Sequence, residues 1–126
     1  MALGTRYGGT GHIPGDRKWQ FAAASGGIVD TSDVELAAAI AGLEVHCVAI
    51  QVVDADVTVA TEVVVKDGST IIWRMFLPNA QSANGNTNPV SFTFPLPLRS
   101  SVGVELNVAA ITTSSELYVN AQGYYA

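Results

Sequence analysis

The sequence predicts an all-β protein, specifically an antiparallel β-sandwich of the jelly-roll type with an extended N-terminal arm. From Trp19 onward, apolar and polar residues mostly alternate, which is the period of a β-strand. Breaks rich in glycine, proline and asparagine separate these runs at short intervals, and no credible long helix interrupts them. About eight short strands in one domain are typical of sandwiches and jelly rolls.

The first strand is expected over residues 19–24, where a pair of glycines ends it. Residues 32–41 fit two structures. Ser32 and Glu35 form a capping-box pattern that would begin a helix, yet the apolar residues that follow also alternate as in a strand. We favour a strand because the surrounding segments are β.

The strand expected over 44–54 alternates so that Val45, Cys47 and Ala49 share a face. The next, over 57–66, is β-branched along most of its length, which favours a pleated sheet.

An Asp67-Gly68 pair between two β runs predicts a tight hairpin, because a type I′ turn needs positive φ at both central residues. This register sets Glu62 opposite Trp73 and places Trp73 on the face away from Val65. Both faces then carry large apolar groups. One face can line the core, and the other requires a partner.

The second half is expected to hold a polar loop over 78–89 and strands over 90–94, 102–110 and 116–125. Two prolines follow the first of these strands, as at a strand end or a sheet edge. No repeat or second domain is evident beyond a division into an arm, residues 1–20, and a sandwich domain, residues 21–126.

The composition predicts that other protein covers part of the surface. Charged residues form 13% of the chain, against about 25% in soluble domains. The hydrophobic fraction is 48% and the mean hydropathy is +0.30. Few charges are therefore available for a solvated surface, and a homo-oligomer or a larger assembly is expected.

The charge is unevenly distributed. Residues 1–20 hold three cations and one acid, a balance of +2, whereas residues 21–126 hold three cations and ten acids, a balance of −7. An acidic body repels polyphosphate, so no nucleic-acid partner is expected. The glycine-rich basic arm is expected to lie on a neighbouring subunit. Its candidate partner-binding residues are Arg6, Tyr7, His12, Arg17 and Lys18, and the interface candidates in the body are Trp73, Tyr124 and Tyr125.

No enzyme or cofactor chemistry is predicted. The glycines of the arm miss both phosphate-binding motifs, because Gly15 precedes Asp16 and Pro14 interrupts the dinucleotide pattern. Cys47 is the single cysteine, so no intrachain disulfide is possible. No signal peptide is expected, and the longest apolar run, 36–43, is too short to span a membrane.

No metal site is predicted either. His46 and Cys47 are adjacent in a strand and point to opposite faces, so they cannot act together locally. Asp54 and Asp56 are two residues apart and could share a face and hold Ca²⁺, but two solvated acids at a turn is the favoured interpretation.

The order of features over residues 28–126 is similar to that of a known group of proteins. The stretches concerned are LAAAIAGLEVHCVAIQVV (36–53), VTVATEVVVKDGSTIIW (57–73), NPVSFTFPLPL (88–98), VGVELNVAAITTSS (102–115) and ELYVNAQGYYA (116–126). This order resembles small jelly-roll structural proteins in the virions of tailed bacteriophages. The resemblance implies a structural role without catalytic residues.

Composition, arm and resemblance together predict a capsid decoration or cement protein on the outer surface of a phage head, assembled in the host cytoplasm. Its partners would be the major capsid protein and copies of itself, with a trimer favoured, and many modest contacts would add through avidity. The alternative is a receptor- or glycan-binding head- or tail-fibre domain. Loop 78–89 and the aromatic residues, Trp73 among them, would then carry the ligand.

Overall fold

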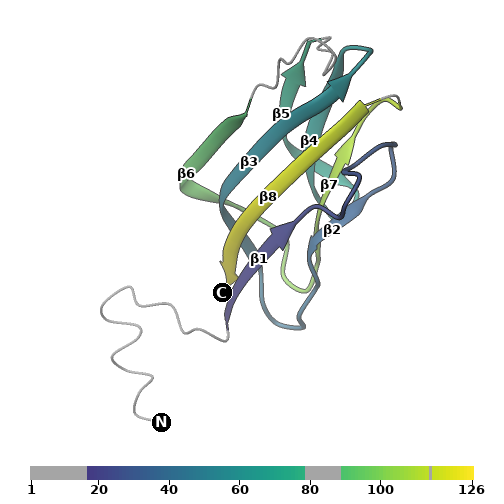
Figure 1. The fold of residues 1–126 in the computed structure, drawn as a ribbon. Helices are drawn as coiled ribbons and strands as arrows, with labels where there is room; N and C mark the ends of the chain where they lie inside the picture. The colour runs from purple at the N-terminus through teal and green to yellow at the C-terminus, as the bar shows by residue number, and fades with distance from the viewer. Residues whose placement is uncertain (1–16, 79–88, 114) are drawn as a thin grey trace.

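The computed structural model describes residues 17–78, 89–113 and 115–126, and this part of the chain is a sandwich of two antiparallel four-stranded sheets (Figure 1). The strand order is β1-β8-β3-β6 in the sheet nearer the viewer in Figure 1, called the front sheet, and β2-β7-β4-β5 in the back sheet. The strands are β1 (Lys18–Ala22), β2 (Val34–Ala37), β3 (Val45–Val57), β4 (Thr61–Asp67), β5 (Thr70–Leu77), β6 (Val90–Arg99), β7 (Leu106–Ala110) and β8 (Ser115–Tyr125). The predicted all-β sandwich is confirmed, whereas residues 1–16 of the arm and 79–88 of the polar loop lie outside the described residues.

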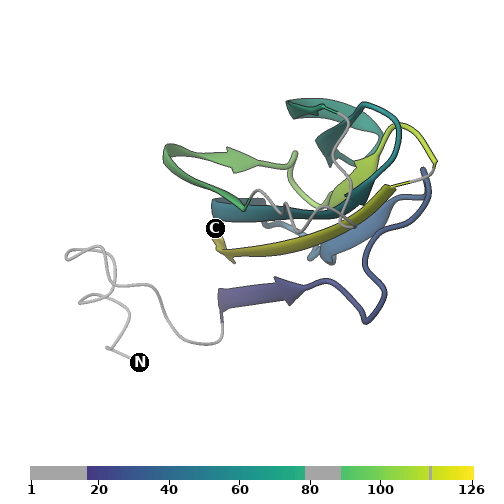
Figure 2. The same cartoon turned by 45° about the horizontal axis from the view of Figure 1, so that its top comes forward.

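Among the described strands, β4 and β5 are the one consecutive pair that shares a sheet as neighbours. Every other step along the chain leads from one sheet to the other, so each sheet is assembled from strands that are distant in sequence. Figure 2 shows the two layers from a second direction. Residues that lie far apart in the chain therefore become neighbours on each outer face.

The core fills the space between the two sheets with β-branched residues and leucines. Alternate side chains of each strand point inward, and those of the central strands are completely removed from solvent. Burial of this apolar surface is the main stabilising term of the fold. The largest fully buried side chains include Val45, Ile50, Val52, Val63, Val65, Leu106, Val108, Leu117 and Val119.

Two bulges in β3 change which residues face the core. The pairing of β3 with β8 skips Val48 and Ala55, so the inward positions shift from Cys47 to Ile50 and later from Asp54 to Val57. The prediction that Ala49 shares a face with Val45 and Cys47 is therefore wrong. Ala49 lies on the outer face, because the extra residue at each bulge reverses the alternation.

The hairpin between β4 and β5 is confirmed, but its predicted register is wrong. Asp67 pairs with Thr70, so Gly68 and Ser69 form the turn, and Gly68 supplies a positive φ of 61°. A register shift after Val65 sets this residue opposite Trp73. The indole therefore faces the core side of the sheet rather than the outside.

Several strand boundaries also differ from the predicted ones. β1 begins at Lys18, so residues 18–20, assigned to the arm by sequence, belong to the front sheet. The ambiguous segment 32–41 contains a strand, β2, as favoured. β7 is shorter than predicted because Gly103 adopts a positive φ of 74° in a turn that begins at Ser101.

Gly123 in β8 lies where the front sheet leaves no room for a side chain. A Cβ at this position would collide with the carbonyl oxygen of His46 and with the indole of Trp19. Because one obstacle is backbone, Gly123→Ala should lower the free energy of unfolding in urea by about 3 kcal/mol. Gly42→Ala is the control, because its Cβ would meet nothing within 4 Å and only the positive φ of 81° should cost about 1 kcal/mol. Equal losses in the two variants would contradict this close packing.

Candidate functional site

The described residues contain no cluster of three or more His, Cys, Asp or Glu side chains suited to a metal ion. The second bulge of β3 separates the two candidate aspartates. Asp54 pairs with the core residue Leu117 and is buried, whereas Asp56 pairs with Glu116. The interpretation as two solvated acids at a turn is wrong, because both belong to β3 and Asp54 is 2% exposed.

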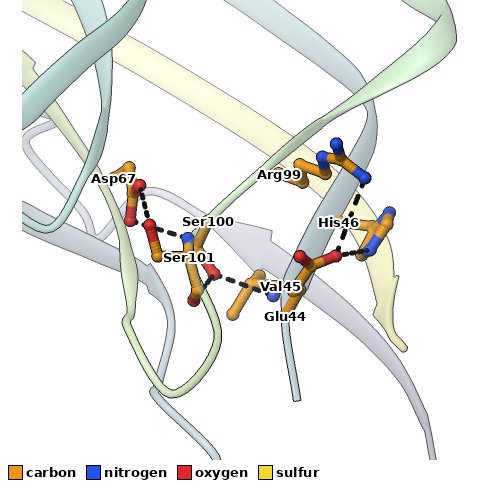
Figure 3. A network of polar contacts seen from close by, with 7 residues as sticks. All are labelled: Glu44, Val45, His46, Asp67, Arg99, Ser100 and Ser101. Carbon is orange, nitrogen blue, oxygen red and sulfur yellow. Dashed lines mark hydrogen bonds and ion pairs between the residues drawn. The ribbon is translucent and has the colours of Figure 1, made fainter.

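A polar clamp joins the two sheets at one end of the sandwich (Figure 3). The Asp67 carboxylate at the end of β4 accepts hydrogen bonds from the backbone N–H of Ser101 (2.9 Å) and from its hydroxyl (2.7 Å). The buried hydroxyl oxygen of Ser100 accepts a bond from the N–H of Val45 (2.9 Å). The Ser100–Val45 bond satisfies buried polar groups, and the exposed Asp67–Ser101 bonds fix the β6–β7 connection, so the clamp has a structural role.

Aromatic and charged residues lie on the outer face of the front sheet next to this clamp, and Figure 3 shows three of them, Glu44, His46 and Arg99. The imidazole of His46 stacks on Tyr124, with ring centroids 4.8 Å apart, and its Nε2 lies 3.1 Å from Glu44 Oε1. Arg99 approaches the same carboxylate at 4.0 Å, and Lys18 pairs with Tyr124 in the sheet register. Lys18 was predicted as a partner-binding residue of the arm and Tyr124 as an interface residue of the body, but the fold makes them neighbours.

An open hollow of about 630 Å³ lies on the front sheet and crosses all four of its strands. Two rows of paired residues form its outward side. These rows are Gln20–Gln122–Ala49–Thr93 and Ala22–Asn120–Gln51–Ser91, and we call them the amide groove. None of the residues that line it carries a charge.

The sequence analysis missed the amide groove because its residue types are ordinary on a polar strand face. No motif marks Gln20 or Gln122, and they are adjacent only because β1 pairs with β8. These residues can be recognised as one surface only when the strand order is known.

A different surface follows β5, the edge strand of the back sheet. Phe76 is 64% exposed and points outward, since Met75 packs against the core and Leu77 is buried. Ile72 is also exposed, and Arg74 between them pairs with Glu62 at 2.9 Å. Ile72, Arg74 and Phe76 are called the β5 strip.

The other three sheet edges are protected. β6 contains two prolines, which cannot donate ladder hydrogen bonds, and β1 and β2 are five and four residues long. β5 differs from these three edge strands because it has eight residues and no proline, although a register shift at Ile72 and the charge of Arg74 interrupt it. An edge of this kind can pair with a strand of another chain.

The predicted partner-binding residues fall into separate places. Arg6, Tyr7 and His12 lie outside the described residues, and Arg17 is exposed just before β1.

The predicted aromatic interface residues also separate. The half-buried ring of Trp73 packs edge-on against Phe92 and Phe94, with ring centroids 5.4 and 5.9 Å apart. Tyr125 lies against the core and donates a hydrogen bond to the carbonyl of Ala38 (3.0 Å), and its burial raises its pKa.

The chain has no match among protein-family models, curated proteins or solved structures. Within the described residues, no helix has the length and apolar character needed to cross a bilayer.

Cys47 lies in the core with no exposed surface, and burial raises the pKa of its thiol from 9.0 to about 11. The folded state therefore keeps this proton at pH values where the unfolded state releases it. The resulting stability is present below pH 9 and is lost as the pH rises to about 11.

Over this range, the free energy of unfolding in urea should fall by about 2 to 3 kcal/mol more in the natural chain than in Cys47→Ala. Tyrosines ionise in both chains. The difference between the two plots of the free energy of unfolding against pH therefore measures the contribution of the Cys47 thiol. Parallel slopes would show that Cys47 does not titrate differently in the two states.

Proposed function

We propose that this chain is a virion structural protein of the decoration or cement type, which binds the outer surface of a tailed-phage head. The observation that carries the proposal is the β5 strip, which has exposed apolar side chains on an edge strand of eight residues without proline, in a chain that has few charges. A surface of this kind gains free energy when a neighbouring subunit covers it. Copies of the chain and the major capsid protein are the proposed partners.

The order of the strands supports a jelly-roll topology. Eight strands form the two sheets β1-β8-β3-β6 and β2-β7-β4-β5, and all connections but the β4–β5 hairpin cross between them. Jelly rolls are double-sheet folds of eight strands, and viral capsid and lectin domains are among their known uses. The fold is thus compatible with a capsid role, although the surface, not the topology, carries the proposal.

The attachment mechanism that we propose is mechanical. The two packed sheets form a rigid body, the β5 strip contacts an adjacent copy, and the basic segment before β1 pairs with acidic groups of a neighbour. Arg17 and Lys18 are exposed where this segment meets the front sheet. Several such contacts, each weak alone, would hold the protein on a symmetric shell through avidity.

The glycan-binding alternative is less well supported at the residues first suggested for it. Trp73 is half-buried and packs inward against Phe92 and Phe94, so little of its ring is left for a sugar. Loop residues 79–88 lie outside the described residues.

Purified protein mixed with phage heads assembled without it should decorate them, as seen by electron microscopy. Removal of residues 1–16 should leave the circular dichroism spectrum of the sandwich unchanged and reduce occupancy at equal concentration, because the proposed partner-binding residues Arg6, Tyr7 and His12 are lost. Failure of the full chain to bind at any ratio would refute the cement role. Equal occupancy after the deletion would refute the role of the arm.

The β5 strip is tested separately by Phe76→Glu. A charge at this exposed position should weaken self-association about tenfold, measured by light scattering over a concentration series, because it must be desolvated at the contact. Val102→Glu is the matched control, since Val102 is 60% exposed but lies in the β6–β7 connection. If both variants associate like the natural chain, or both weaken equally, the β5 strip is not the contact.

A further inference from the structure

The amide groove has the lining of a binding site for an uncharged polar ligand. Gln20, Gln51, Asn120 and Gln122 supply primary amides, each of which both donates and accepts hydrogen bonds. The hydroxyls of Ser91 and Thr93 at the β6 side add groups with the same double capacity. Ligand hydroxyls need partners of this type, because they too donate and accept.

The shape of the groove follows from its two alanines. Ala22 and Ala49 lie in the same rows as the amides, so a methyl group replaces a longer side chain at these points. The result is an open hollow with small apolar patches between polar groups. The C–H faces of a sugar ring fit such patches, while its hydroxyls reach the amides.

Part of the hydrogen-bonding capacity of the groove is unused within the described chain. Asn120 Nδ2 donates to Gln51 Oε1 at 3.2 Å, which orients this pair. The side chains of Gln20 and Gln122 have no hydrogen-bond partner among the described residues. These exposed amides can therefore bind a ligand without breaking an internal contact.

Tyrosine rings flank the groove on both sides along the direction of β8. The outward residues of β8 are, in order, Tyr118, Asn120, Gln122 and Tyr124, so two tyrosines enclose two amides. The two tyrosines are six residue steps apart along the strand, a length of about 20 Å. Tyr124 is fixed by stacking on His46, and the Tyr118 hydroxyl donates to Glu116 at 3.1 Å, a bond that raises the pKa of Tyr118. Such fixed rings can stack on sugars at the margins of the groove.

We propose that the amide groove binds a neutral glycan chain. The lack of charged residues in its lining argues against phosphate or acidic sugars. This proposal does not depend on the capsid role, because the groove is on the front sheet and the β5 strip is on the back sheet.

The test is a microarray of neutral and acidic bacterial oligosaccharides probed with the full chain, followed by titration calorimetry with the strongest neutral binder. The natural chain should bind neutral glycans saturably. Gln122→Ala combined with Asn120→Ala should weaken this binding about tenfold or more, because two hydrogen bonds are lost.

Ala49→Tyr, which fills the hollow, gives a second and independent loss of binding if the proposal holds. Thr93→Ala in the groove should weaken binding, whereas its matched control Thr70→Ala on the back sheet should not. Circular dichroism of each variant verifies the fold.

Three results would overturn the proposal: no neutral glycan bound, binding restricted to acidic glycans, or equal binding by the natural chain and the groove variants. Loss of self-association in the Gln122→Ala, Asn120→Ala chain would instead identify the groove as a contact between copies and would also overturn it. Capsid binding by these same variants reports separately on the proposed cement role.

Discussion

The two bulges of β3 are the constraint on which both the core and the outer face of the front sheet depend. This strand of thirteen residues pairs with β6 on one side and with β8 on the other. Strict alternation along it would turn Ile50 and Val52 outward and bring Ala49 and Gln51 into the core. The residues skipped at Val48 and Ala55 restore the apolar side chains to the inside. The same shift turns Ala49 and Gln51 outward into the groove, so the bulges determine the residues of both the core and the groove.

Much of the architecture could be predicted from alternation and turn residues alone. The strands, the β4–β5 hairpin and the sandwich all follow from local pattern. The registers do not, because a bulge leaves no mark in the residue types: Val48 is as good a strand residue as its neighbours. Trp73 was assigned to the wrong face for this reason. The turn uses Gly68 and Ser69, while the Asp67 side chain is held by Ser101, a contact from 34 residues away in the chain.

The candidate binding surfaces also depend on strand order and register, which the local sequence pattern does not reveal. Trp73 and Tyr125 were predicted as interface residues because they are aromatic. In the structure, both are partly buried and pack against the core. The amide groove instead combines ordinary polar residues from four strands, and only the order β1-β8-β3-β6 brings them together. Because the two outer faces belong to different sheets, one can contact a neighbouring subunit while the other stays open to a ligand.

The position of β8 has a consequence for how the chain reaches its native state. This strand lies between β1 and β3 and pairs with both, so residues 18–22 and 45–57 have no shared neighbour until it arrives. It is also the last of the described strands to be synthesised. The front sheet is therefore completed only after synthesis of the domain is nearly finished. Until then, its apolar inner face remains incompletely covered. A topology dominated by such distant pairings predicts slow folding, with apolar surface exposed until β8 pairs.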